Sequence, residues 1–273
     1  MIKRVIGVAL IAVIGAACTE KSGDNPAKPE PSNGEKHYVE SIDIYYDDTS
    51  ASDVVSPGES IVFDLDDKNR ITNIQGVEYN DANEVVDIYA DIKFKYSDDS
   101  RSLTITTTMD GMDFAAECDL NDRGAIATAR WQSPEELYGL VEDFVYNDKG
   151  ELVTYTLSMG NRVGMSFNYE WEDGNIVRII SEDMEVNDVC TYTDEPNPYN
   201  IDMFYAYAWN MPMLAEVILI HDGLLGNTNR SMLKSYSTNL YGEEINEVID
   251  HKFKDGLVDY TIYDDTIFKY RCF

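Results

Sequence analysis

The feature that most constrains the fold of this chain is a short phrase that returns between stretches of alternating apolar and polar residues. It reads aromatic residue or leucine, polar residue, Asp, one or two variable residues, Gly or Asn, and an aliphatic residue. Because Asp bonds turn backbone and Gly or Asn accepts positive φ, each copy predicts a hairpin turn. Successive hairpins predict an antiparallel meander. Copies stand at residues 65–71, 79–85, 96–99, 120–126, 146–152, 171–176 and 253–257.

The stretches between the turns have the period of half-buried β-strands, with one face in a core and one in water. In residues 86–96, charged residues alternate with the apolar positions Val86, Ile88, Ala90, Ile92, Phe94 and Tyr96. The alternation recurs at residues 112–120, 163–171, 38–46, 61–65, 103–109, 152–159, 184–192, 248–253 and 257–262. We therefore expect an all-β fold of ten or more strands. The predicted architecture is a large antiparallel meander curled into a soluble barrel or half-barrel.

Two segments break this pattern and predict one or two short helices, near residues 133–140 and 211–225. The first has Ser133 as a cap, Pro134 at the first helical position and Glu136 three residues after the cap. The second begins around Pro212 and runs towards Gly223 or Gly226. Ahead of it lies the most apolar stretch after the leader, which contains Tyr205, Tyr207 and Trp209.

The N-terminus has the pattern of a secretory signal. A basic start is followed by an apolar stretch at residues 5–14, and small residues lead to Cys18. Gly15-Ala16-Ala17-Cys18 resembles the bacterial lipoprotein lipobox, with Gly where Leu is commonest. The alternatives are an ordinary signal peptide cut nearby or a membrane helix, but residues 5–17 are shorter than the roughly 20 apolar residues of a span. The resemblance implies a signal peptide at 1–17 and acyl chains on Cys18.

Three segments follow from this interpretation. Residues 18–36 contain three prolines and mostly small or polar residues, and we expect a lipidated flexible tether. No second linker of this kind interrupts residues 37–273, so we expect a single β domain there. The predicted location is the outer membrane, with membrane contact through the lipid anchor. The periplasmic and the surface face both remain open.

Charge narrows the set of partners. The chain has a formal net charge of −30, and removal of Lys3 and Arg4 with the leader makes it −32. Phosphate backbones need Lys and Arg to displace their counterions, so nucleic acid is excluded as a partner. Scattered acids favour a solvated surface over a specific cation site.

Cys118, Cys190 and Cys272 remain after Cys18 is lipidated, an odd number for an exported protein. Each lies on the apolar side of an alternating stretch, which predicts core thiols. A Cys118–Cys190 disulfide is the alternative. The spacing of these residues contains no zinc motif.

The turn phrases resemble the tyrosine-aspartate repeats of bacterial surface proteins. Tyr79, Tyr96 and Tyr146 match the repeat's tyrosine, and the other copies depart from it with Leu65, Leu120, Trp171 and Phe253. Behind a lipobox, this arrangement is similar to a Bacteroides-type lipoprotein family of unknown function with a porin-like β fold. The resemblance implies an antiparallel sheet curled into a barrel or half-barrel, and it supplies no catalytic residues.

No sequence motif indicates chemistry. The chain lacks HExxH, GxSxG and a phosphate-binding glycine loop, and it has only three histidines. Asp64, Asp66, Asp67 and Asn69 provide oxygen ligands without the Gly and Glu of a helix-loop-helix calcium site, so we expect a hairpin turn there. We predict no catalytic residues, no metal, no cofactor and no enzymatic activity. A hydrolase without a readable motif is the alternative.

Aromatic residues supply the remaining functional signal. Most occupy core positions, whereas Tyr45 and Tyr89 alternate onto the polar face, where rings can stack on sugars. Tyr205, Tyr207 and Trp209 are the predicted ligand-binding residues. The predicted function is an anchored, non-enzymatic protein that binds a glycan, a lipid or an envelope partner. A structural or envelope-assembly protein without a small ligand is the second hypothesis.

The C-terminal strand bears on whether the barrel crosses a bilayer. Counting back by twos from Phe273 gives Arg271 and Lys269, which do not form the apolar row of a lipid-facing strand. We therefore expect the sheet to lie outside the hydrocarbon.

Overall fold

The computed structural model describes residues 39–45, 57–80, 82–109, 112–133, 139–160, 162–182, 185–197, 223–240, 243–254, 257–263 and 266–272. These ranges contain β-strands and turns and no helix. The strands are β1 (Val39–Tyr45), β2 (Glu59–Leu65), β3 (Ile71–Tyr79), β4 (Val85–Tyr96), β5 (Ser102–Met109), β6 (Met112–Leu120), β7 (Ile126–Ser133), β8 (Leu140–Tyr146), β9 (Leu152–Met159), β10 (Arg162–Glu172), β11 (Asn175–Ser181), β12 (Val186–Pro196), β13 (Ser231–Leu240), β14 (Glu243–Val248), β15 (Asp250–Lys254), β16 (Leu257–Tyr263) and β17 (Thr266–Cys272).

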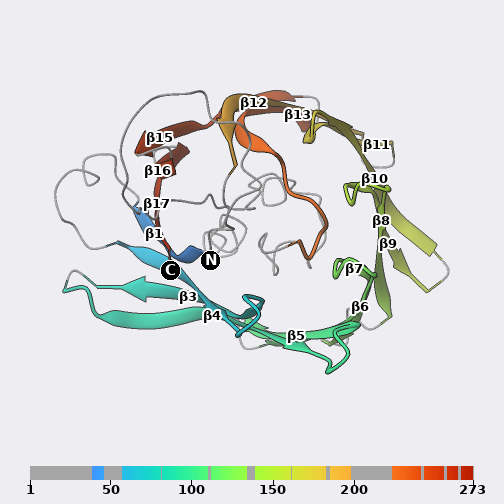
Figure 1. The fold of residues 1–273 in the computed structure, drawn as a ribbon, viewed down its shortest axis with the longest axis horizontal. Coiled ribbons are helices and arrows are strands. Elements are labelled where there is room, and N and C mark those ends of the chain that lie inside the picture. The colour runs from blue at the N-terminus through green and yellow to red at the C-terminus, as the bar shows by residue number, and fades with distance from the viewer. Residues whose placement is uncertain are drawn as a thin grey trace.

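The strands form one antiparallel ring. From β1 to β14 each strand pairs with the next in sequence, β15 to β17 do the same, and β17 pairs with β1. Only Ile249 separates β14 from β15, and these two strands make one bent row between β13 and β16. The seventeen described strands therefore make sixteen rows. Figure 1 shows them arranged around a closed outline, and the predicted all-β barrel is confirmed.

A histidine bridges the bend in the row of β14 and β15. The Ile249 N–H donates to the Lys234 carbonyl oxygen at 2.9 Å. In β15, His251 Nε2 lies 2.7 Å from the carbonyl oxygen of Leu233 in β13, and Nδ1 lies 2.9 Å from Thr261 Oγ1 in β16. Because a carbonyl only accepts, Nε2 is the donor. The imidazole thus joins β13 to β16, and burial lowers its pKa.

A second side-chain cluster closes the seam between the chain's first and last described strands. The Ser60 hydroxyl donates to Asp43 Oδ1 at 2.6 Å, and Arg271 Nη2 donates to the same oxygen at 2.8 Å. These residues come from β2, β1 and β17, so one carboxylate connects three adjacent rows.

The core lies inside the ring. Alternate residues of nearly every strand are buried in one apolar cluster, and only the interior is shared by all rows. In β4, Ile92 and Phe94 are buried while Lys93 and Lys95 are exposed. Aromatic rings of neighbouring rows pack together, with Tyr155 5.3 Å from Phe144 between centroids. The alternation predicted from sequence is therefore confirmed, with polar side chains on the outer wall.

A carboxylic acid interrupts the apolar interior. Glu142 of β8 is fully buried, and the Trp131 indole N–H donates to its Oε1 at 2.5 Å. Nearby, burial raises the pKa of Tyr155 and of the Cys118 thiol. Cys118 and Cys190 are both buried and neither forms a disulfide, so the disulfide alternative is wrong.

Two predictions about burial and helices need correction or stay open. Val86 and Ile88, predicted to face the core, are 54% and 51% exposed because β5 pairs with β4 only from Ile92 onwards. Ser133 ends β7 and Leu140 begins β8, while the rest of the predicted helix at 133–140 lies almost entirely outside the described residues. Of the predicted helix at 211–225, the described residues 223–225 form a turn. Within the described ranges, no helix is long and apolar enough to cross a membrane.

Candidate functional site

The barrel has two rims, because antiparallel rows turn alternately at opposite ends. One end carries the turns at residues 66–70, 97–101, 121–125, 147–151 and 173–174. We call it the strapped rim, for a segment described below. The opposite end, the far rim, carries the turn at residues 80–84.

Four copies of the repeated phrase, three on the strapped rim and one on the far rim, fold into the same turn. In the copy at 147–151, Asn147 Oδ1 accepts the backbone N–H groups of Lys149 at 3.0 Å and Glu151 at 3.1 Å. Gly150 has a φ of 93°, as the predicted glycine position requires. Asp66, Asn80 and Asn121 accept backbone N–H groups at the same two offsets. In these four copies the acceptor is the polar residue at the second position of the phrase. The predicted bonding by Asp is confirmed at Asp66 and, in the copy at 96–99, at Asp99, which accepts the Arg101 N–H at 3.1 Å, whereas an Asn takes this role in the copies at 120–126 and 146–152.

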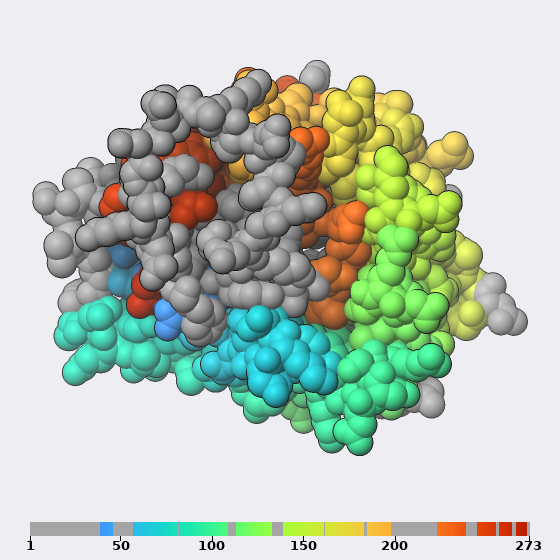
Figure 2. All heavy atoms as spheres, viewed as in Figure 1, coloured from blue at the N-terminus to red at the C-terminus, as the bar shows by residue number. Residues whose placement is uncertain are grey.

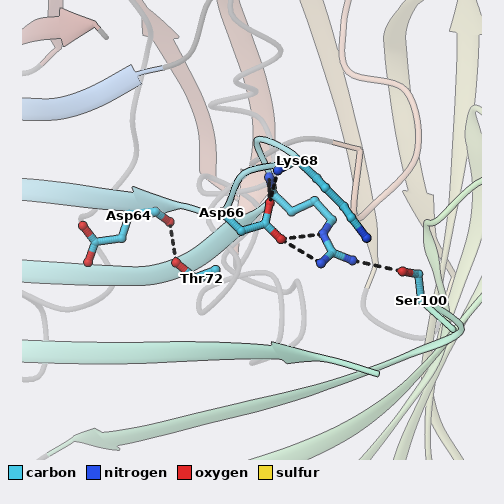
Figure 3. Close-up of polar contacts among 6 residues, drawn as sticks. Asp64, Asp66, Lys68, Thr72 and Ser100 are labelled. Carbon is cyan, nitrogen blue, oxygen red and sulfur yellow. Dashed lines mark hydrogen bonds and ion pairs between the residues drawn. The ribbon is translucent and has the colours of Figure 1, made fainter. Parts of the chain in front are cut away.

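The turn at 66–70 contains the acids weighed as calcium ligands. One oxygen of Asp66 accepts the N–H groups of Lys68 and Arg70, both at 2.9 Å, and the other accepts the Arg70 guanidinium at 2.8 Å (Figure 3). Burial opposes ionisation, yet these hydrogen bonds hold the pKa of Asp66 below its ordinary value. Arg70 also reaches Ser100 of the next turn on this rim at 3.1 Å. Both oxygens of the Asp66 carboxylate therefore accept hydrogen bonds within the turn, and Arg70 links this turn to the next one on the rim.

A segment from the long β12–β13 connection crosses the strapped rim. Residues 223–230, which we call the strap, run over the mouth of the ring in orange in Figure 1. Their backbone and amide groups bond three hairpin turns in succession. The bonds run from Ile126 N to Leu224 O at 2.8 Å, from Asn227 N to Gly150 O at 2.8 Å and from Arg230 N to Gly174 O at 2.9 Å.

Asparagine side chains hold the end of the strap beside β11. Asn229 Oδ1 accepts the Ile176 N–H at 2.6 Å, and Asn175 Oδ1 accepts the Ser231 N–H at 2.9 Å. Asn229 is buried, with 2% of its surface exposed. One bond joins a strap side chain to the β11 backbone, and the other joins a β11 side chain to the backbone that follows the strap, so the end of the strap is tied to β11 from both sides.

Two glycines let the strap approach the turn at 147–151. A Cβ on Gly226, whose φ is 87°, would lie 2.5 Å from the Gly150 carbonyl oxygen and 2.6 Å from Tyr146 Cε1. A Cβ on Gly150 would lie 2.6 Å from Arg123 Nη1. At Gly226 the close atom is a backbone carbonyl oxygen, so only glycine fits there, whereas at Gly150 it is the end of the Arg123 side chain.

A pocket of about 340 Å³ lies between the strap and the turns beneath it. That volume lies within the ~300–1,000 Å³ range of small-molecule sites. It joins strap residues to the hairpin turns of β8–β9 and β10–β11. The described residues that line it are Glu151, Trp171, Gly174, Gly223, Gly226, Asn227, Thr228 and Arg230.

The pocket combines one aromatic ring with several hydrogen-bonding groups. The Trp171 indole N–H donates to the Leu152 carbonyl oxygen at 2.7 Å, which fixes the ring. Asn147 Nδ2 donates to Glu151 Oε2 at 2.7 Å, and Lys149 Nζ lies 3.8 Å from Oε1. Arg230 is exposed at the pocket's edge. An aromatic face with an amide, a carboxylate and a guanidinium is suited to a polar ring that carries hydroxyl groups.

The residues predicted from sequence lie elsewhere. Tyr205, Tyr207, Trp209 and the lipidation site Cys18 are outside the described residues. Tyr89, predicted to be exposed, is half-buried, and its ring lies against Gly76, where an added Cβ would be 2.4 Å from Cε2.

Sequence reasoning missed the strap pocket because the strap's contacts are distant in sequence. The sequence pattern assigns Trp171 to the apolar face of a strand and to the first position of a turn phrase, and neither role indicates a pocket. The sequence feature that indicates this region is the long connection before β13. It contains Gly223 and Gly226, which the sequence pattern assigns to the end of a helix.

Comparisons with known proteins agree with this architecture. A family model described as a domain of unknown function (DUF4595) with porin-like fold matches residues 63–265. The structure of a porin-like protein from Bacteroides uniformis has a TM-score of 0.66 at 16% identity, with 86% of this chain and 98% of that chain covered. One from Bacteroides vulgatus has a TM-score of 0.51 at 13% identity, with the same coverage. No curated protein matches this chain. At these identities the likeness to the two structures concerns the fold.

Proposed function

This chain belongs to the porin-like DUF4595 family of unknown function, and we propose that it is a non-enzymatic, lipid-anchored protein of the outer membrane that binds a glycan in the strap pocket. Acyl chains on Cys18 and a tether at residues 18–36 would hold one β domain at the membrane. The observation that carries the proposal is the fixed Trp171 ring in a pocket whose other lining residues are glycines or have polar side chains.

The outer wall supports anchoring by lipid rather than by the strands. Outward positions on the strands either side of β5 carry charged residues, such as Lys93 and Lys95 on β4 and Glu117 and Asp119 on β6. A charge facing lipid at mid-bilayer costs up to ~2–4 kcal/mol, and membrane barrels alternate apolar residues outward instead. The alternation here has the opposite sense, with apolar residues inward.

The pocket chemistry favours a glycan over a lipid and binding over hydrolysis. Its polar groups, Asn227, Arg230 and Glu151, suit hydroxyl groups better than an acyl chain. Glycosidases use a pair of carboxyl groups across the scissile bond. Among the described lining residues Glu151 is the only carboxylate, and Asn147 already donates to it.

The test is a saccharide array probed with the full chain in detergent, followed by titration of the best ligand. Trp171→Phe keeps an aromatic face, whereas Trp171→Leu removes it. We expect the Phe variant to bind within a few-fold of wild type and the Leu variant to bind about tenfold more weakly, equivalent to about 1.4 kcal/mol.

Phe253→Ala is the matched control, because Phe253 is a 39% exposed aromatic residue of β15 outside the pocket. Its affinity should equal that of wild type. If Trp171→Leu binds the ligand as tightly as wild type, the pocket is not the glycan site. If no saccharide binds at all, the glycan proposal fails.

A further inference from the structure

The β3–β4 hairpin on the far rim has one side without a described partner. β4 pairs with β3 from Val85 to Lys93, but its pairing with β5 runs only from Ile92 to Tyr96. Among the described residues, no strand pairs with residues 85–91 on the β5 side. Figure 1 shows the hairpin extending beyond the ring, and it forms a projection at the lower left of Figure 2.

Apolar side chains are exposed along this free edge. Val85, Val86 and Ile88 are 56%, 54% and 51% exposed. Three large apolar residues within four positions, next to an unpaired strand edge, are a feature that soluble proteins avoid unless a partner covers it.

The hairpin is held in shape without that partner. The Asn80 side chain accepts two backbone N–H groups of the turn, at 3.0 Å and 2.9 Å. Tyr89 lies across Gly76 of β3, in the close contact described above. The Ile88 N–H donates to Asp87 Oδ1 at 2.9 Å. A preformed edge of this kind accepts an added strand at low ordering cost.

Charge selects the partner. Residues 78–92 contain no Lys or Arg, and Glu78, Glu84 and Asp87 make no ion pair among the described residues, whereas Asp91 is paired with Lys93 at 2.9 Å. Pairing with a second copy of this edge would bring these acids together on a chain of net charge −30. An extended segment with basic residues between apolar ones would meet both the acids and the exposed apolar side chains.

We propose that β4 of the far rim docks an extended, basic and apolar segment of another envelope protein by adding a strand at residues 85–91. Main-chain hydrogen bonds would supply affinity, and Val86, Ile88 and Asp87 would supply specificity. The site is at the opposite end of the barrel from the strap pocket. It is also opposite the end at which β1 begins at Val39.

The test uses a fluorescent peptide of alternating valine and lysine and the full chain in detergent, with anisotropy as the readout. The control peptide has the same sequence with alternate backbone amides N-methylated, so that charge is kept and strand pairing is lost. We expect the N-methylated peptide to bind about tenfold more weakly than its parent.

Two uncharged double variants locate the site. Val86→Ser/Ile88→Ser should weaken binding of the parent peptide about tenfold. Val189→Ser/Val248→Ser changes two exposed strand valines elsewhere, 44% and 69% exposed, and should leave binding unchanged. Circular dichroism checks that both variants fold.

Three results would overturn the proposal. Equal binding of the two peptides would mean attraction by net charge alone. Equal weakening by both double variants would place the site elsewhere. Dimerisation of the wild-type chain that Ile88→Ser abolishes, seen by sedimentation, would make a second copy the occupant. Trp171→Leu leaves this edge unchanged, so failure here is distinguishable from failure of the glycan proposal.

Discussion

The turns at residues 147–151 and 80–84 have the same internal hydrogen bonds and different surroundings. In each, an Asn side chain accepts two backbone N–H groups and donates to a Glu carboxylate, at 2.7 Å for Asn147 and 3.1 Å for Asn80. Glu151 is 5% exposed beneath the strap, whereas Glu84 is exposed on the projecting hairpin. The local phrase thus makes a turn, and long-range contacts decide whether that turn becomes part of a pocket.

The largest effect should come from breaking the strap's contact with the turn at 147–151. Gly226→Ala places a Cβ 2.5 Å from the Gly150 carbonyl oxygen at a φ of 87°. We expect a loss of about 2–4 kcal/mol in the free energy of unfolding, from left-handed strain plus overpacking. Saccharide binding should be lost with it. Denaturant unfolding and ligand titration measure the two effects.

Gly124→Ala is the control for conformational strain. Gly124 has a φ of 84°, and an added Cβ there meets nothing within 4 Å. We expect it to cost only about 1–2 kcal/mol and to leave saccharide binding intact. Equal losses of stability and affinity in the two variants would mean that the close approach of the strap is unimportant.

The second effect separates the two turns directly. Asn147→Ala removes two backbone bonds and leaves the buried Glu151 carboxylate without its amide donor, so we expect a loss of about 1–3 kcal/mol in unfolding free energy. Asn80→Ala removes the matching bonds beside the exposed Glu84, and we expect about 0.5–1.5 kcal/mol. Chemical denaturation compares them. A greater loss of unfolding free energy for Asn80→Ala than for Asn147→Ala would contradict the view that burial beneath the strap makes the turn at 147–151 the more sensitive of the two.

The smallest effect concerns pH and β13, the strand that continues from the strap. Burial lowers the pKa of His251 from its ordinary 6.5, so on acidification the unfolded chain binds the proton before the folded one. Its stabilising contribution is complete above about pH 6.5 and declines below it, with a slope of at most about 1.4 kcal/mol per pH unit.

Hydrogen exchange between pH 7 and pH 5.5, corrected for the intrinsic rates, reads out this effect. Protonation removes the Nδ1 acceptor from Thr261 of β16 and charges a buried imidazole bonded to β13, so β13 and β16 should lose protection on acidification, while residues 80–84 should not. His251→Gln should abolish the difference. An equal loss of protection at residues 80–84 would indicate global acid destabilisation rather than an effect of this histidine.

Much of the fold followed from local patterns. The alternation in β4 and β6 placed Ile92, Phe94, Ala116 and Cys118 on the core face, because side chains on a pleated strand have a period of two. Positive φ at Asn69, Asn83, Gly124 and Gly150 matched the phrase. These features depend on residues a few positions apart, which a sequence displays directly.

The rest depends on distant contacts. Val86 and Ile88 have the core pattern but extend past the end of β5, and strand ends are not visible in the alternation. Glu142 occupies an inward position because Trp131 of the neighbouring strand donates to it. The pocket needs residues 223–230 to lie over turns from three other hairpins. Register and strap position, rather than local propensity, determine the site.

The most direct test of the glycan proposal is hydrogen exchange of the wild-type chain with and without the saccharide that binds most tightly on the array. Bound ligand should slow exchange in residues 223–230 and 147–151, where the pocket lies, and should leave residues 80–84 unchanged. Protection confined to the far rim, or no protection at the strap under saturating ligand, would contradict the assignment of the strap pocket as the binding site.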